Sequence, residues 1–332
     1  MTIGKSTLTA VIALLFATLT LAQTSSSAAI HRNQRTLPSS LTLLGLGFHR
    51  QTDTGLTGKA DPDPVALGLA KARVYRFASA DFPGASTSVV FDRNTSTVLG
   101  AFKFSSSSPV SGFTLYNGLY QSLSVPGSLD NTATGMNTSG QIVGIYTDLV
   151  GVVHGFLDNA GVFTTLDSPA GGTIEPIDIN DSGEIVGAYI DSSSVFHGFS
   201  TLDNGATYSI VDVPGATFTQ AAGVNSAGAI SGSWRDSSSM YHGFLFSGGT
   251  FTSFDFPLAT NTAAFGINDS NEIAGYTFGA SGGDGFIYSA GAFTRVDVAG
   301  ASQTLLTRIK NKGQITGAYV DSAGEEHGFT GR

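Results

Sequence analysis

The chain contains no cysteine among its 332 residues. This absence excludes disulfides, thiol nucleophiles, thiolate metal sites and lipid attachment through an N-terminal cysteine. Charged residues are also scarce, at 12% of the chain, and there are only ten prolines. Because 41% of the residues are hydrophobic and 43 are glycines, the composition is typical of a turn-rich all-β protein with a packed core.

Several motifs that mark common enzyme sites are missing as well. The chain has no P-loop, no His-Glu-x-x-His and no Gly-x-Gly-x-x-Gly between a strand and a helix. We therefore expect no cofactor, although an enzyme can still assemble its site from scattered loops.

The first 22 residues predict a secretory signal peptide. Lys5 precedes an apolar run over residues 10–17, and small residues follow up to Ala22, where we expect cleavage. Thr18 and Thr20 interrupt the run, which is shorter than the ~20 residues that a membrane span needs. We therefore expect a secreted, extracellular or periplasmic protein without a transmembrane anchor. Its formal charge of −9 argues against nucleic acid as a partner.

The chain from about residue 73 onward is built from one repeat of about 43 residues. A Gly-Phe pair marks it six times, with the phenylalanines at Phe113, Phe156, Phe199, Phe244, Phe286 and Phe329. An asparagine recurs in phase, and we call its position the asparagine column: Asn94, Asn137, Asn180, Asn225 and Asn268, with Lys310 in the sixth repeat. A proline recurs in phase too, at Pro83, Pro126, Pro169, Pro214 and Pro257, with Ala299 in the sixth place.

Each repeat divides into four short β-rich segments separated by turn sequences. In the fifth repeat we predict strands at Thr262–Asn268, Glu272–Phe278, Gly285–Tyr288 and Ala292–Val298. Four antiparallel strands in about 43 residues match one blade of a β-propeller, which takes ~40–45 residues.

The two ends of the repeat region complement each other. Arg73–Phe82 resembles a fourth strand without the first three, and the last repeat stops after its third strand at Phe329. We predict a closed six-bladed propeller over residues 73–332, in which the N-terminal strand completes the last blade and hides the sheet edges. A linear β-solenoid is the alternative, and it needs no such match. Residues 23–72 are predicted to be a partly ordered leader.

The repeat text resembles a known family. Its clearest form includes Gly135-Met136-Asn137, the segment 140–144, Asp148 and His154-Gly155-Phe156. This resembles the bacterial extracellular repeats of the HAF family, over all six repeats, with His-Gly-Phe where the family name records His-Ala-Phe. The resemblance implies export and brings no catalytic residues.

Polar residues that recur in register are interpreted as structural. His154, His197, His242 and His327 share one position, and they would lie too far apart around a ring to bind one metal ion. We expect each to orient the turn that holds Asp148, Asp191, Asp236 or Asp321. Aspartates two residues before the proline position are expected to accept N–H bonds from the following turn: Asp81, Asp167, Asp212, Asp255 and Asp297. The column asparagines are expected to cap turns, and asparagine tolerates left-handed backbone geometry. No metal site is predicted.

Candidate functional residues are those at which one repeat departs from the others. Two positions before the asparagine column, three repeats have glycine and the other three have Asp92, Asp178 and Arg308. If the first strand lines the channel, these charged groups lie near its axis. A salt bridge between Asp92 and Arg308 on neighbouring blades is the structural alternative.

Charge is unevenly distributed along the chain. No lysine or arginine occurs between Lys103 and Arg235. Closure would bring the remaining basic residues of the repeats to one side: Arg73, Arg76, Arg93, Lys103, Arg295, Arg308, Lys310 and Lys312. Such a field can steer a charged partner.

Three functions are compatible with these features. The first is a secreted or cell-surface binding and scaffold module, monomeric, with a polysaccharide or an envelope protein as partner. The second is an extracellular propeller enzyme, a hydrolase or lyase acting on polysaccharide, with Asp92, Asp178 and Arg308 in its channel. The third is an envelope structural protein. The lack of a catalytic motif favours a non-enzymatic role.

Overall fold

The computed structural model describes residues 75–105, 107–279 and 283–332. The predicted signal peptide and the leader over residues 23–72 lie outside the described residues. The described residues form 24 β-strands and no helix, so the all-β prediction is confirmed. Among them, accordingly, no helix has the length and hydropathy to cross a membrane.

The strands follow the sequence repeats, and we number the repeats 1 to 6 in chain order. The first strands are β2 (Thr87–Arg93), β6 (Ser128–Met136), β10 (Ile174–Ile179), β14 (Phe218–Val224), β18 (Asn261–Ile267) and β22 (Gln303–Ile309). The second strands are β3 (Thr97–Lys103), β7 (Ile142–Asp148), β11 (Ile185–Ile190), β15 (Ile230–Arg235), β19 (Ile273–Phe278) and β23 (Ile315–Val320). The third strands are β4 (Ser111–Tyr116), β8 (Val153–Asn159), β12 (Phe196–Thr201), β16 (Tyr241–Ser247), β20 (Gly285–Ser289) and β24 (Glu326–Gly331). The fourth strands are β5 (Leu119–Ser122), β9 (Val162–Leu166), β13 (Ser209–Ile210), β17 (Thr250–Phe254) and β21 (Ala292–Val296).

Each repeat folds as an antiparallel meander, as predicted. Repeats 1, 2 and 5 form separate four-stranded sheets. Repeats 3 and 4 are joined into one eight-stranded sheet by a single parallel bridge between Phe196 and Phe218. The sheet therefore consists of two meanders that touch at one point.

Repeat 6 takes its fourth strand from the other end of the chain. Strand β1 (Phe77–Ser79) pairs with β24, with Phe77 opposite Gly331. Arg76 and Arg332 also exchange backbone hydrogen bonds of 3.0 and 3.1 Å. The strand is shorter than the predicted Arg73–Phe82, and its first two predicted residues lie outside the described part of the chain.

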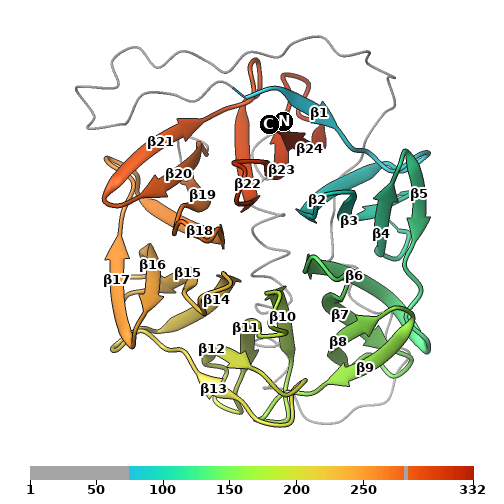
Figure 1. Ribbon diagram of the computed structural model, residues 1–332, viewed down its shortest axis with the longest axis horizontal. Coiled ribbons are helices and arrows are strands. Elements are labelled where there is room, and N and C mark those ends of the chain that lie inside the picture. Colours follow the sequence, from blue (N-terminus) through green and yellow to red (C-terminus); the bar gives the residue numbers. More distant parts are fainter. Residues whose placement is uncertain (1–74, 106, 280–282) are drawn as a thin grey trace, which may run out of the picture.

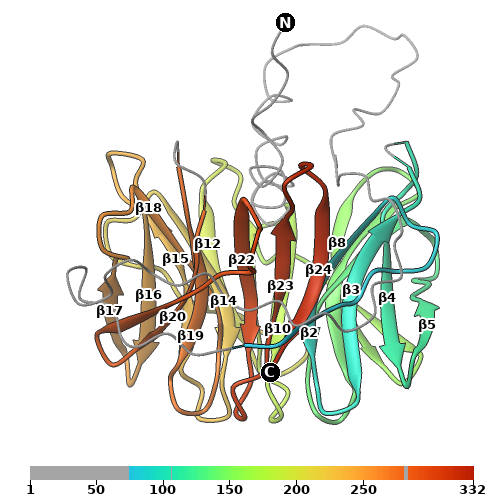
Figure 2. The same ribbon diagram turned by 90° about the horizontal axis from the view of Figure 1, so that it is seen from above.

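The sheets are arranged around a central axis, with the first strand of each repeat innermost (Figure 1). Seen from the side, the strands run along this axis (Figure 2). Radial four-stranded meanders around an axis define a β-propeller.

The Gly-Phe marker is explained by packing within each meander. The phenylalanine of every pair is fully buried, and it lies across from a glycine of the second strand. In repeat 2, Phe156 pairs with Gly144, where a Cβ atom would lie 2.8 Å from the phenyl ring and 2.1 Å from the carbonyl oxygen of Thr132. Only glycine leaves room for the ring, whose burial stabilises the fold by about 1.5–3 kcal/mol.

Each of the four histidines lies between two aspartates of its own sheet. His154 Nδ1 is 2.6 Å from Asp167 Oδ1, and its Nε2 is 3.4 Å from Asp148 Oδ2. The ring of Tyr146 stacks on the histidine at 5.2 Å. The expected contact with the Asp148 turn is therefore present, and the four histidines belong to four different repeats.

The aspartates two residues before the proline position do not bond as predicted, because they do not accept N–H groups of the turn that follows. Asp212 Oδ1 accepts the N–H of Gly198 at 3.0 Å, and Oδ2 is 2.6 Å from His197 Nδ1. Both partners belong to the preceding third strand, because the end of the fourth strand runs beside it. The turn that follows is held instead by Thr219, whose hydroxyl accepts the N–H of Val213 at 3.3 Å.

Candidate axial ligand site

Every first strand carries a β-bulge just before the asparagine column. The register shifts fall at Val90/Asp92, Ala133/Gly135, Pro176/Asp178, Ala221/Gly223, Ala264/Ile267 and Leu306/Arg308. A bulge adds a residue to one strand and re-aims its side chains. The bulges therefore determine what the positions of Asp92, Asp178 and Arg308 face.

The three glycines at this position are required by close approach of the next repeat. A Cβ on Gly135 would lie 2.6 Å from the carbonyl oxygen of Ile177. A Cβ on Gly266 would lie 2.5 Å from Arg308 Cδ. Glycine is common where two backbones come this close.

The structure brings Asp92, Asp178 and Arg308 together. Arg308 Nε is 3.8 Å from Asp92 Oδ2, and its Nη2 is 3.6 Å from Asp178 Oδ1. All three side chains are buried. Lys310 joins them, because its Nζ lies 2.6 Å from Asp92 Oδ1. The sixth member of the asparagine column thus supplies a second cation, so two carboxylates face two basic groups.

These side chains also bond to the backbone of other repeats. Asp92 Oδ2 accepts the N–H of Met136 at 2.9 Å, and Asp178 Oδ2 accepts the N–H of Val224 at 3.0 Å. Arg308 donates to the carbonyl oxygen of Ile177 at 2.6 Å. Burial raises the pKa of Asp178, and the charge of Arg308 opposes that rise. The network cross-links the first strands and leaves neither carboxylate free as an acid or base.

The asparagine column forms a second ring of contacts. Asn225 Oδ1 accepts the N–H groups of Ala227 and Ala229, at 3.0 and 2.9 Å, and caps its own turn as expected. Its Nδ2 donates to the carbonyl oxygen of Asn268 in the next repeat at 3.1 Å. The same bond to the next repeat starts from three other members of the column, Asn137, Asn180 and Asn268.

The column asparagines themselves do not use the left-handed geometry that asparagine tolerates. Positive φ falls three residues later, at Gly140, Gly183, Gly228, Asn271 and Gly313. The asparagine caps the turn from an ordinary conformation, and the chain reverses at the fourth residue, where glycine or asparagine tolerates the geometry.

The turns after the first strands surround a pocket of about 280 Å³. They lie at the end of the molecule where the C-terminus is marked in Figure 2. Asp178 and Arg308 lie at the base of the pocket, beside the apolar side chains of Met136, Val224 and Ile267. Arg308 reaches across this base to other repeats.

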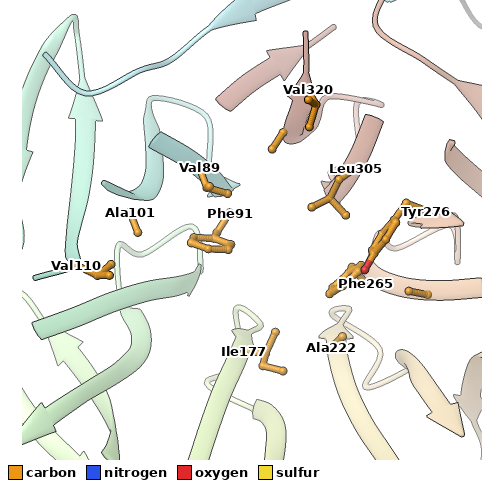
Figure 3. Close-up of a cluster of buried hydrophobic side chains, with 12 residues drawn as sticks. Val89, Phe91, Ala101, Val110, Ile177, Ala222, Phe265, Tyr276, Leu305 and Val320 are labelled. Atoms are coloured by element: carbon orange, nitrogen blue, oxygen red, sulfur yellow. The ribbon is translucent and has the colours of Figure 1, made fainter. Parts of the chain in front are cut away.

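Farther along the axis the lining becomes apolar. Phe91, Ile177, Phe265 and Leu305 come from four first strands and belong to one buried cluster (Figure 3). A second cavity of about 20 Å³ lies beside Glu175, a buried residue whose Oε1 has no hydrogen-bond partner. Burial raises the pKa of this carboxyl well above its usual range. The sequence analysis did not single out Glu175, because its neighbours in a strand give no sign of its burial.

The chain matches no model of a known protein family and no curated protein sequence. Among solved structures it is similar to a putative gluconolactonase, with 13% identity over 83% of this chain and 97% of that one and a TM-score of 0.48. It is also similar to the β-propeller domain of the Trilobed protease from Pyrococcus furiosus, with 9% identity, coverage of 73% and 95%, and a TM-score of 0.48. A third is the six-bladed lectin of Aleuria aurantia, with 10% identity, coverage of 73% and 90%, and a TM-score of 0.45. The likeness is one of fold alone.

Four of the basic residues predicted to gather on one side line this axial pocket: Arg93, Arg308, Lys310 and Lys312. The others do not. Arg295 lies between Asp284 and Asp297, Lys103 is buried, and Arg76 is the exposed residue just before the outer strand β1. Arg73 lies outside the described residues. The sequence pattern indicated the excess of basic residues near the two ends but not the pocket that collects them.

Among the described residues, one group of side chains has the donor atoms of a metal site. Those of Asp321, Glu325 and His327 lie within 4.8 Å of one another. Asp321 Oδ1 already accepts the N–H groups of Ala323 and Glu325, both at 2.8 Å. His327 faces Asp321 as its counterparts face theirs in the other repeats. The arrangement is therefore accounted for by the turn and the histidine contact.

Proposed function

We propose that this protein is an exported, monomeric, closed six-bladed β-propeller that binds a ligand in its axial pocket. The pocket carries the proposal, because turns of all six repeats contribute to it and two of the three residues that depart from the repeat pattern, Asp178 and Arg308, line it. The repeat motif supports an HAF-type protein at the cell surface or in the medium, where polysaccharide is the partner we propose.

Binding is favoured over catalysis by the state of the acidic groups. Asp92 and Asp178 are buried, paired with cations and bonded to backbone N–H groups. Two rim carboxylates are engaged as well. Asp181 Oδ1 accepts the N–H of Thr138 at 2.8 Å, and Asp269 Oδ1 accepts the N–H of Ser226 at 2.9 Å. General acid–base catalysis needs a carboxyl group within reach of substrate, and these are used to join the repeats.

The test is a binding screen of residues 23–332 against a glycan array and cell-envelope fractions. Thr138→Trp places a large side chain at the exposed rim of the pocket. Val150→Trp is the matched control, because Val150 lies in an exposed turn at the other end of strand β7 of the same repeat. We expect saturable binding that Thr138→Trp abolishes and Val150→Trp preserves. An absence of binding, or binding that both variants retain, contradicts the proposal.

A further inference from the structure

We infer that the axial pocket selects the negatively charged terminal sugar of a glycan, a uronic acid, through Arg93 and Lys312. This inference rests on the proposed binding function and specifies its ligand. It follows from where the charges of the molecule lie, which of them are already paired, and the size of the pocket.

Basic residues are concentrated in the pocket of an otherwise acidic protein. The described residues include nine lysines and arginines and 22 aspartates and glutamates. Four of the nine basic residues line the pocket, compared with only three of the 22 acids, Asp178, Asp181 and Asp269. A concave site with the opposite sign to the rest of the surface attracts anions selectively.

The acids of the pocket are already engaged. Asp178 faces Arg308 at the buried base. Asp269 uses both oxygens, because Oδ1 accepts the N–H of Ser226 and Oδ2 accepts a bond of 2.6 Å from Asn311 Nδ2. Asp181 and Asp269 keep their negative charge, because their donors are neutral, but their bonded oxygens are directed at neighbouring turns and the four basic residues of the lining outnumber the three acids.

Two basic groups of the pocket form no ion pair within the described part of the chain. Among the ion pairs of the described residues, none involves Arg93 or Lys312. The only hydrogen bond described from the Arg93 guanidinium is a long one, 3.4 Å from Nε to the carbonyl oxygen of Asn94. Burial lowers the pKa of Arg93, the positive charge of Arg332 lowers it further, and the negative charge of Asp92 opposes these two effects. A carboxylate in the pocket would relieve this repulsion and accept the guanidinium's remaining N–H groups.

The size and shape of the pocket favour a single sugar that enters end-on. Its volume of about 280 Å³ is small, since ligand pockets usually measure about 300–1,000 Å³. Arg308 lies across the base, and six turns surround the mouth. Apolar side chains such as Val224 and Ile267 can pack against the C–H groups of a sugar ring, and the hydroxyls of Thr95 and Thr138 lie at the rim. The chain beyond the terminal sugar would extend into solvent.

The experiment compares matched oligosaccharides that end in glucuronate or in glucose, by calorimetric titration of residues 23–332. Charge-assisted hydrogen bonds contribute about 1.5–3 kcal/mol, so we expect the glucuronate form to bind at least about tenfold more tightly. Arg93→Gln and Lys312→Gln should each weaken glucuronate binding about tenfold and weaken binding of the glucose form much less. Arg76→Gln is the control, because it removes the same charge from an exposed position outside the pocket.

The outcomes separate this inference from the proposed function. Equal affinity for the two sugars, or equal losses with Arg76→Gln, overturns the uronate inference and leaves a neutral-glycan function standing. Competition by inorganic phosphate at the same concentration as glucuronate also overturns it, because the site would then bind any small anion. If no glycan binds at all in the array, the proposed function itself fails. Affinity for the uronate should fall as NaCl is raised.

Discussion

At the scale of single residues, the role of a charged group in this protein depends on what the neighbouring repeats bring to it. Asp92, Asp178 and Arg308 occupy the same position in three repeats, yet one is a cation that bridges two anions. The sequence singled out all three as departures from glycine. The distances between them, and the contact of Lys310 with Asp92, depend on the β-bulges of the first strands. The sequence pattern of a single repeat does not predict these bulges.

Replacing Arg308 should destabilise the fold severely. Arg308→Met leaves Asp178 buried without its cationic partner and removes the bonds to the carbonyl oxygens of Thr134 and Ile177. Breaking a buried pair from one side costs about 3–5 kcal/mol. Urea denaturation measures the loss, with Lys312→Gln as an exposed basic control that should change stability by less than about 0.5 kcal/mol. Equal stability of both variants and wild type would mean that the axial network contributes nothing.

Glu326 should make stability dependent on pH. It is buried in β24, neither carboxyl oxygen has a hydrogen-bond partner, and burial raises its pKa to about 8 from 4.5. The folded protein therefore keeps this proton while the unfolded chain releases it. The contribution to stability is intact below about pH 4.5 and is lost progressively as the pH rises to about 8, at about 1.4 kcal/mol per pKa unit.

The variant Glu326→Gln should remove this dependence. We expect its melting temperature to equal that of wild type near pH 4.5 and to exceed it increasingly toward pH 9. Glu325→Gln, at the exposed neighbouring position, serves as the control. Parallel melting curves for Glu326→Gln and wild type across this range would show that the carboxyl is not held protonated.

At the scale of the strand, repeat 5 has the same type of contact between a basic side chain and two aspartates, but different residues form it. The histidine position holds Asp284, and the basic partner comes from the fourth strand as Arg295. Arg295 Nε lies 2.6 Å from Asp297 Oδ2. In repeat 2 the position equivalent to Arg295 is Thr165. Thr165 pairs with Phe156 across the sheet, just as Arg295 pairs with Phe286. A nitrogen-bearing side chain therefore lies between two carboxylates in both sheets, although it comes from different strands.

This equivalence predicts a compensating pair of substitutions. Arg295→Thr alone leaves Asp284 and Asp297 facing each other without a cation and should destabilise the fold by about 1–2 kcal/mol, a partly exposed site being screened by solvent. Adding Asp284→His should recover most of the loss, because the histidine can then contact Asp297. Urea denaturation of both single variants and the double variant gives the coupling. Additive effects would contradict the equivalence.

At the scale of the whole molecule, the first and last described strands, β1 and β24, meet in one sheet. His327 of β24 lies 3.6 Å from Asp81, which follows β1, and 3.6 Å from Asp321. The contact with Asp81 raises the pKa of His327 against the opposing effect of burial. The stabilisation is present below the histidine's ordinary pKa of 6.5 and is lost as the pH rises through the raised value. Glu326 acts in the same direction, so this junction should be strongest in acid.

Closure of the ring can be tested by a cross-link. Ala78 and Thr330 are paired across β1 and β24, and antiparallel neighbours at about 5.5 Å meet the geometry of a disulfide. Because the chain has no cysteine, Ala78→Cys/Thr330→Cys should form one defined bond. We expect faster migration on a non-reducing gel and a higher melting temperature that reductant reverses. Ala78→Cys alone is the control, and a double variant that stays reduced under oxidant would contradict the pairing.

The sequence by itself determined the class of fold and most of the strands. The predicted strands of repeat 5 match β18 to β21 within two residues at each end, and Asn268 falls outside β18 because it caps the turn. Strands and turns can be predicted from local sequence patterns, and here the same pattern recurs six times at a fixed period. The complementary ends of the repeat region likewise predicted that β1 would pair with β24.

Only the tertiary structure decided what faces the axis. The bulges turn the ends of the first strands, so that Arg308 reaches carbonyl groups more than a hundred positions away in the chain. The same geometry places Arg93 beside Lys310 and Lys312 in one pocket. Distances between residues of different repeats depend on how all the repeats pack together, so the sequence pattern of one repeat cannot predict these distances. The partners of the aspartates before the proline position could not be predicted for the same reason. Asp212 bonds to Gly198 on the strand beside it and not to the turn that follows in sequence.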